Sequence, residues 1–151
     1  MQKFISSSPA ETEQIAAEFA KTLRGGEVLA FRGGLGMGKT CFTRGLASGL
    51  GIDPAEVSSP TFALVNEYRG GRLPLWHFDM YRICTMDDLY STGFFDYLSP
   101  HAVLAVEWSE NIEEALPQET TFISLAPGEK ENGKTQEESR HRLIVKERGC
   151  R

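Results

Sequence analysis

The chain has 151 residues, of which 40% are hydrophobic and 25% charged, proportions typical of a globular protein and not of a disordered or membrane-spanning chain. We expect a single domain over residues 1–151, because this length leaves no room for a second one. The formal net charge of −5 argues against tight, direct binding to nucleic acid, which needs a concentrated basic surface.

The N-terminal segment, residues 1–6, lacks the apolar core and the cleavage site of a signal peptide. No apolar run approaches the length that crosses a bilayer. We therefore expect a cytoplasmic protein without a membrane partner. Cys41, Cys84 and Cys150 are far apart and include no C-x-x-C pair, which predicts plain thiols and neither a disulfide framework nor a zinc site.

The first predicted helix begins after Ser8. This residue is suited to the N-cap, Pro9 to the first helical position, and Glu11 completes a capping box. The pair Gly25 and Gly26 is expected to end the helix. This element is interpreted as structural.

Residues 33–40, Gly-Gly-Leu-Gly-Met-Gly-Lys-Thr, fit the pattern G-x-x-x-x-G-K-[ST] at every fixed position. Glycines let successive backbone N–H groups turn inward around phosphate oxygens. In this pattern Lys39 reaches the β- and γ-phosphates, and the Thr40 hydroxyl ligates Mg²⁺. The sequence therefore predicts a nucleotide site, and the residues expected to line it are Gly34, Leu35, Gly36, Met37, Gly38, Lys39, Thr40 and Cys41.

The surroundings of the loop agree with this interpretation. The apolar run 27–32 predicts a buried strand before the loop, and apolar residues spaced by four, at Phe42, Leu46 and Leu50, predict a helix after it. That helix would direct its positive N-terminal end at the phosphates.

The chain then becomes strand-like. Segments 61–68 and 73–78, joined by a turn at 69–72, predict a β-hairpin inserted after the phosphate-loop helix. A capping box at 85–88 opens a short helix, and 94–98 forms a second helical turn.

The apolar run 102–106 predicts a central strand covered on both faces, and it ends at Glu107. We expect a helix at 110–116, strands at 120–125 and 140–146, and a mobile loop at 127–139. The order of elements predicts an α/β fold, a three-layer P-loop NTPase domain around a mixed central sheet.

Hydrolysis of a bound nucleotide also needs a carboxylate near Mg²⁺ and a polar group that orients water. Glu107 matches the Walker B acid in position, since open α/β sheets bind ligands at the carboxyl ends of their strands. Asp79, after the second hairpin strand, is the other candidate for a metal or catalytic role. Spacing alone does not divide these roles between the two acids.

Three further residues remain open at this point. His77 lies two residues before Asp79 on one strand face, and is either a packed core histidine or part of the site. Arg82 is suited to pair with a phosphate or with Asp79. Trp108 either stacks on the nucleotide or packs in the core.

Taken together, the motifs resemble the TsaE family, also called YjeE. They are residues 33–40, 42–46, 59–62 (Ser-Pro-Thr-Phe), 64–68 (Leu-Val-Asn-Glu-Tyr), 77–82 (His-Phe-Asp-Met-Tyr-Arg) and 107–108 (Glu-Trp). The similarity covers about residues 8–117. Departures from the family pattern are small and lie at Cys41 and Ser109.

The resemblance implies a small bacterial ATPase of tRNA threonylcarbamoyladenosine synthesis that uses ATP and Mg²⁺. It implies that the protein acts with TsaB and TsaD, and that tRNA is met only through this complex. By residue, it implies that Lys39 holds phosphates, Thr40 and Glu107 bind Mg²⁺, and Asp79 has a catalytic or metal role. It further implies that Thr61 is a switch residue and that Trp108 occupies an essential position beside the nucleotide.

Two other classes of function are compatible with such a loop. A GTP-operated switch of the Ras type needs an [NT]-K-x-D motif that reads guanine, and no lysine here lies in that context. A small-molecule phosphotransferase needs an acceptor pocket and usually an arginine-rich lid. Both are less favoured than a partner-stimulated ATPase with weak activity alone.

Overall fold

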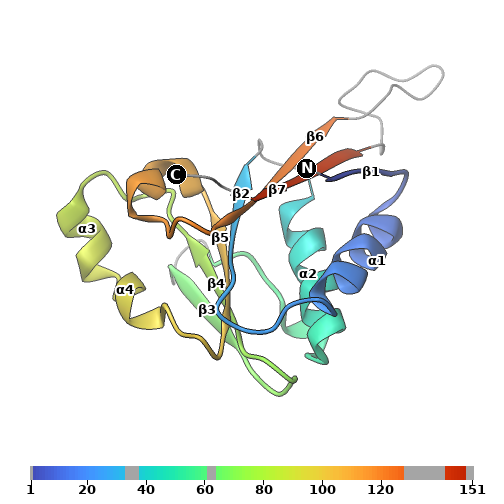
Figure 1. Cartoon of the computed structure of the whole chain (residues 1–151), viewed down its shortest axis with the longest axis horizontal. Coiled ribbons are helices and arrows are strands. Elements are labelled where there is room, and N and C mark those ends of the chain that lie inside the picture. Colours follow the sequence, from blue (N-terminus) through green and yellow to red (C-terminus); the bar gives the residue numbers. More distant parts are fainter. Residues whose placement is uncertain (1, 33–37, 61–63, 128–141, 149–151) are drawn as a thin grey trace.

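A seven-stranded mixed sheet forms the centre of the chain in the computed structural model, which describes residues 2–32, 38–60, 64–127 and 142–148 (Figure 1). The strand order is β1-β7-β6-β2-β5-β4-β3. Strands β2, β4, β5 and β6 run parallel, whereas β1, β3 and β7 join their neighbours antiparallel. The strands are β1 (Gln2–Ser6), β2 (Val28–Arg32), β3 (Val65–Tyr68), β4 (Leu75–Asp79), β5 (Val103–Glu107), β6 (Thr121–Pro127) and β7 (Arg142–Arg148).

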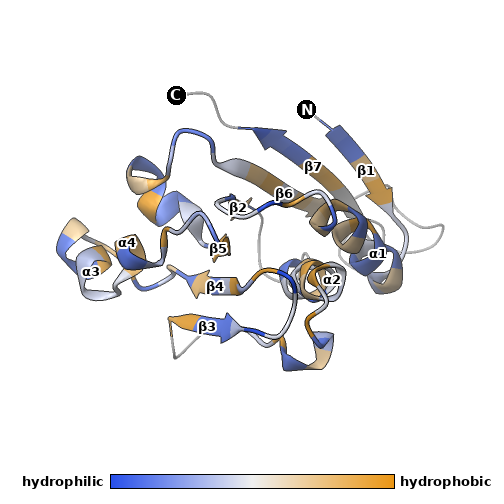
Figure 2. Cartoon of the chain, turned by 60° about the horizontal axis from the view of Figure 1, so that its bottom comes forward, coloured by the Kyte–Doolittle hydropathy of each residue, from blue (hydrophilic) through white to orange (hydrophobic). Residues whose placement is uncertain are grey.

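Helical elements cover both faces of this sheet. Helices α1 (Pro9–Ala20) and α2 (Lys39–Leu50) lie on one face, and α3 (Met86–Ser91), α4 (Phe94–Tyr97) and the 3₁₀ segment η2 (Ser109–Ala115) lie on the other (Figures 1 and 2). A short 3₁₀ turn, η1 (Pro54–Glu56), follows α2. The predicted α/β architecture with a mixed sheet is thereby confirmed, as is the hairpin β3–β4.

Alternation along the buried strands divides the core in two. In β5, Val103 and Ala105 face α1 and α2, whereas Leu104 and Val106 face α3, α4 and η2. Side chains alternate between the faces of a strand, so Glu107 follows Val103 and Ala105 onto the α2 face. His77 and Asp79 share one face of β4 by the same rule.

Helices α1 and α2 approach until their backbones nearly touch. A Cβ atom on Gly45 would lie 2.3 Å from the carbonyl oxygen of Glu13, and one on Gly49 would lie 2.4 Å from that of Ala17. Only glycine fits at these positions of α2. The guanidinium of Arg72 then donates to the carbonyl oxygens of Ala20 and Leu23 at 2.6 Å each, which ties the loop before β4 to the end of α1.

Several boundaries differ from the predicted ones. Strand β1 was not predicted, because its residues are mostly exposed and give little alternation. Helix α1 ends at Ala20, well before the glycine pair, and the Glu11 carboxylate accepts from the N–H of Ser7 and not from that of Ser8. The predicted helix at 110–116 is a 3₁₀ segment, kinked at Ile112.

Both predicted C-terminal strands are present, with shifted bounds. Pro127, expected in a loop, is the last residue of β6; the rest of that expected loop lies outside the described residues. Strand β7 begins at Arg142. No helix within the described ranges is long and apolar enough to cross a bilayer.

Candidate active site

Two carboxylates meet where β4 and β5 end. The strands are parallel and in register, so that Asp79 lies beside Glu107, and both are buried, each with 7% of its surface exposed. The backbone N–H of Met80 donates to the Glu107 carbonyl oxygen at 3.0 Å and holds the two strand ends together. The structure therefore brings the two predicted acids to one place, at the carboxyl edge of the sheet.

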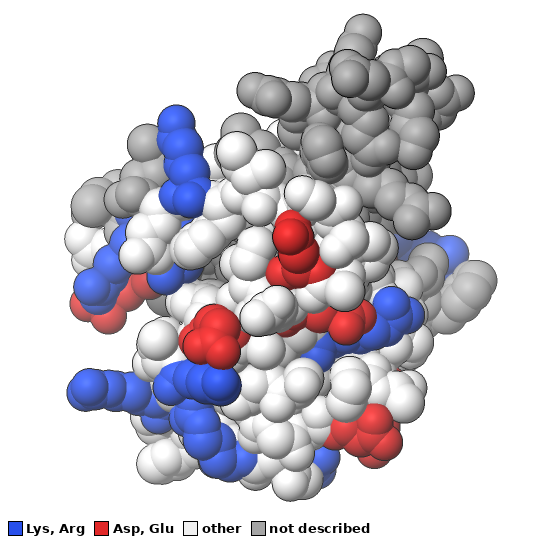
Figure 3. All heavy atoms as spheres, turned by 90° about the vertical axis from the view of Figure 1, so that its right-hand side faces the viewer, with Lys and Arg blue, Asp and Glu red and all other residues white. Residues whose placement is uncertain are grey.

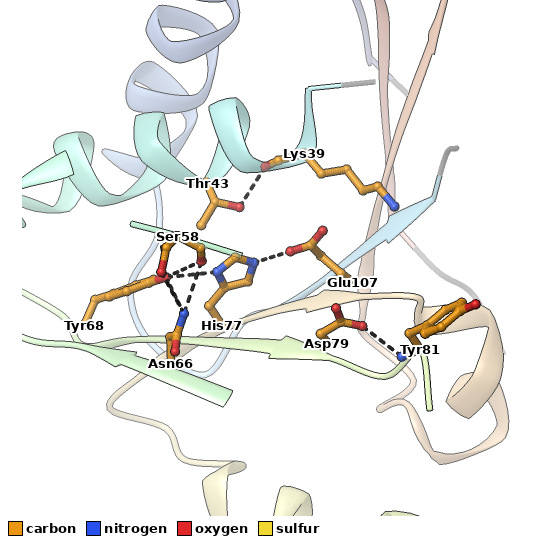
Figure 4. A network of polar contacts seen from close by, with 9 residues as sticks. All are labelled: Lys39, Thr43, Ser58, Asn66, Tyr68, His77, Asp79, Tyr81 and Glu107. Carbon is orange, nitrogen blue, oxygen red and sulfur yellow. Dashed lines mark hydrogen bonds and ion pairs between the residues drawn. The ribbon is translucent and has the colours of Figure 1, made fainter. Parts of the chain in front are cut away.

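Lys39 supplies a positive charge above these acids. It is the first residue of α2 and only 6% exposed. Figure 4 shows its side chain extending over the strand ends, on the side of the sheet where the carboxyl groups of Asp79 and Glu107 lie. Gly38 before it is the N-cap, with a φ of 96° that favours glycine. The first turn of α2 therefore lies on the same face as both carboxylates.

A hydrogen-bonded chain anchors Glu107 from one side (Figure 4). His77 is fully buried, and its Nε2 lies 2.5 Å from Glu107 Oε2. Because a carboxylate only accepts hydrogen bonds, Nε2 carries the hydrogen. On its other side, Nδ1 lies 3.2 Å from the hydroxyl oxygen of Tyr68, and the same oxygen lies 3.0 Å from the Ser58 carbonyl oxygen. His77 is therefore part of the site and not an isolated core histidine.

Asp79 is held by the turn that follows it. The backbone N–H of Tyr81 donates to Asp79 Oδ1 at 2.9 Å. Burial raises the pKa of this carboxyl above its ordinary value, and the neighbouring Glu107 adds to the rise, while the Tyr81 N–H and the charges of His77 and Lys39 oppose it. A cation bound nearby would favour the charged form of Asp79 and so lower this pKa.

Trp108 closes one side of the site. Its indole ring lies 5.1 Å from Lys39 Nζ and 4.8 Å, centroid to centroid, from the Tyr81 ring. Its φ of 57° is left-handed, and only Leu64 shares this among the described non-glycine residues. Such backbone strain in a non-glycine residue persists only where its surroundings hold it, often at functional sites.

Part of the predicted site lies beyond the residues that the structure describes. Gly34, Leu35, Gly36 and Met37 of the loop, and Thr61, lie outside the described residues. Thr40 is half-buried in the first turn of α2. The Cys41 thiol donates to the Pro9 carbonyl oxygen at 3.1 Å and so faces α1, which leaves only its backbone N–H for a phosphate. Arg82 is exposed in the turn after β4.

The oxygen donors present fit a nucleotide-bound Mg²⁺. No group of three or more His, Cys, Asp or Glu suited to a metal occurs among the described residues. Magnesium bound with a nucleotide needs fewer protein ligands, because phosphate and water oxygens complete its shell. Asp79, Glu107 and the Thr40 hydroxyl are hard donors of the kind that it prefers.

Sequence reasoning assigned no role to Tyr68, Asn66 or Ser58. The amide of Asn66 donates to the Tyr68 hydroxyl oxygen at 3.2 Å and to the Ser58 carbonyl oxygen at 3.1 Å. Asn66 also pairs directly with His77 across the hairpin. Cross-strand pairing in the predicted hairpin is the signal that would have found this group.

Comparison with known proteins identifies similar chains. A family model described as "Threonylcarbamoyl adenosine biosynthesis protein TsaE" matches residues 6–137. The tRNA threonylcarbamoyladenosine biosynthesis protein TsaE of Bacillus subtilis is 44% identical over 82% of this chain and 76% of its own length. The protein of the same name from Treponema pallidum is 39% identical over 80% and 88%. The crystal structure of Bacillus subtilis YdiB superposes with a TM-score of 0.73 at 33% identity, covering 99% of this chain and 86% of that one.

Proposed function

The chain belongs to the TsaE family, and from this premise we propose that it acts in tRNA threonylcarbamoyladenosine biosynthesis as a Mg²⁺-dependent ATPase with a P-loop NTPase fold. The family predicted from the motifs is thereby confirmed. The observation that carries the ATPase proposal is the convergence of Lys39, Asp79 and Glu107 on one edge of the sheet. The Lys39 ammonium near two buried carboxylates is an arrangement suited to binding and cleaving a metal-bound phosphate.

In this proposal the first turn of α2 binds the phosphates. Its free N–H groups and its dipole favour an anion at Gly38 and Lys39. The Lys39 ammonium, held over the Trp108 ring, adds charge where negative charge builds up on the transferred phosphoryl group. Thr40 and Glu107 would hold Mg²⁺, whose charge would further neutralise the phosphate oxygens.

The two acids differ in how they are held, which supports different roles. Glu107 Oε2 is occupied by His77, so Oε1 is the oxygen that would face the metal. Asp79 is fixed through Oδ1 by the Tyr81 N–H and would orient the attacking water with its other oxygen. We assign Glu107 to the metal and Asp79 to the water.

His77 is a positioning residue in this scheme. It fixes the Glu107 carboxylate through Nε2, and its own ring is steadied by the Tyr68 hydroxyl at Nδ1. Such outer partners orient a metal ligand and tune it. The chain of contacts ends at Ser58, three residues before Thr61, so the position of Glu107 is tied to the segment that holds the proposed switch residue.

The remaining parts of the proposal concern partners. We propose that the chain works in the cytoplasm with TsaB and TsaD and meets tRNA only through them. The formal net charge of −5 supports an indirect contact with tRNA. ATP is the proposed nucleotide, because the sequence holds no guanine-reading motif.

The test replaces the endogenous gene product by variants and measures threonylcarbamoyladenosine in tRNA. Lys39→Ala and Glu107→Ala are expected to lower the modification to the level of depleted cells, since each removes a charge that acts on the phosphates or metal. Glu56→Ala, an exposed acid in η1, is the matched control and should restore wild-type levels. Unchanged modification with either site variant would refute the assignment.

A further inference from the structure

The face of the sheet covered by α3, α4 and η2 exposes large apolar side chains. Of the large hydrophobic residues exposed in the described chain, only Ile5 lies elsewhere. The others are Tyr81, Met86, Tyr90 and Phe95, with 59%, 47%, 64% and 36% of their surface exposed. The Tyr90 and Phe95 rings pack together at 5.1 Å. Clustered exposure of this kind is typical of binding surfaces.

The same face is acidic. The sequence holds no Lys or Arg between Arg82 and Lys130, whereas the α1–α2 side shows Lys, Arg, Asp and Glu interspersed (Figure 3). Arg32 reaches across from β2 and pairs with Glu113 at 2.6 Å. The exposed acids of α3, α4 and η2 are Asp87, Asp88, Asp96, Glu110, Glu113 and Glu114.

A cavity joins the apolar and acidic parts. It has a volume of about 380 Å³ and lies between the start of α3 and η2. Its walls include Ile83, Met86, Leu89 and Ile112, with Glu110 at the polar side. The space suits an apolar side chain next to a cationic one.

We propose that this surface, the α3–η2 face (Tyr81, Met86, Tyr90 and Phe95 with the rim of Asp87, Asp96 and Glu110), binds a protein partner whose contact region carries Lys or Arg around exposed apolar side chains. The acidic rim favours a partner with a positively charged contact region. Nucleic acid and anionic lipid surfaces are repelled by such a rim, whereas a basic protein surface is attracted to it.

The position of the face links it to the nucleotide site. Tyr81 belongs to the face, and its ring packs on Trp108 beside Lys39. The Asn111 amide of η2 donates to the Met80 carbonyl oxygen at 2.9 Å, next to the turn that holds Asp79. A partner bound here therefore contacts the wall of the active site, which is where stimulation of hydrolysis would act.

The inference rests on the proposed function, which supplies the probe: the purified TsaB–TsaD complex without tRNA. A charge reversal, Asp87→Lys with Glu110→Lys, is compared with Glu18→Lys plus Glu56→Lys, which makes the same change in net charge on the α1–α2 side. Tyr90→Ala is a third variant that removes only apolar contact. Affinity is measured by calorimetry at about 50 mM and about 200 mM salt, with unfolding midpoints as a check on folding.

The reversal on the α3–η2 face should weaken binding about tenfold or more at low salt and less at high salt, because screening reduces charge effects. Tyr90→Ala should weaken binding at both salt concentrations, and the control pair should stay within about twofold of wild type. Equal losses for both reversals, or no loss for either, would overturn the proposal. A wild-type chain that hydrolyses ATP alone and does not bind the complex would overturn it too, while the site assignment stands.

Discussion

The two faces of the sheet are built differently. On the α1–α2 face the helices pack backbone to backbone at Gly45 and Gly49, and the polar groups Glu107, His77 and Tyr68 are buried in one hydrogen-bonded chain. On the α3–η2 face the helices are short, and the rings of Tyr90 and Phe95 and the acidic residues are exposed.

This difference separates two tasks. Positioned carboxylates need neighbours that cannot move, because their orientation must be set before the reaction. A surface that binds another protein needs exposed apolar groups and charge instead. The two faces meet at Asp79, Tyr81 and Trp108, where the fixed site borders the open surface.

The largest expected difference between the two faces of the sheet is in their response to one added methyl group. Gly45→Ala should lower the free energy of unfolding by about 2 kcal/mol, because its Cβ would lie 2.3 Å from the Glu13 carbonyl oxygen and 2.6 Å from the Ala16 Cβ. At an exposed helical position the same change stabilises by about 1 kcal/mol. The sign of the change in the free energy of unfolding, measured by urea unfolding, therefore decides whether α1 and α2 are in close contact.

Gly93→Ala is the matched change on the open face. Nothing lies within 4 Å of an added Cβ there, and only the φ of +75° opposes it. The expected cost is about 1 kcal/mol, from the left-handed conformation alone. A loss as large as that of Gly45→Ala would show that the two faces are equally closed.

A change in activity tests the role of the buried hydrogen-bonded chain. His77→Leu is expected to lower kcat for ATP hydrolysis about tenfold with little change in KM, since Glu107 loses the group that orients it. His77→Gln should recover part of this loss, because its amide N–H can still donate to the carboxylate. Equal kcat for His77→Leu and wild type would restrict His77 to a packing role.

Much of this arrangement was predictable from local patterns. The strand before residues 33–40, helix α2, the hairpin and strand β5 follow from apolar periodicity and turn residues, and the capping box Thr85–Asp88 is present as expected. Asp79 and Glu107 are each predicted at the end of a strand, but their adjacency depends on the pairing of β4 with β5, which local patterns do not give.

Other features depend on contacts between distant segments. Strand β1 forms because β7, far along the chain, pairs with it, and its own residues carry little signal. The link from His77 to Tyr68 and Ser58 requires the register of the hairpin and the path of the loop before it. The 3₁₀ segment η2 follows Trp108, whose left-handed backbone conformation is not predicted by any residue pattern.

In the proposed mechanism, the carboxylate of Glu107 acts in hydrolysis at the edge shared by β4, β5 and α2. Single-turnover hydrolysis and equilibrium binding of Mg²⁺-ATP by purified Glu107→Gln test it most directly. We expect hydrolysis to fall about 100-fold or more while ATP affinity changes by less than about fivefold, because the variant keeps the shape of the side chain and loses its charge. Hydrolysis at the wild-type rate by a folded Glu107→Gln chain would contradict it.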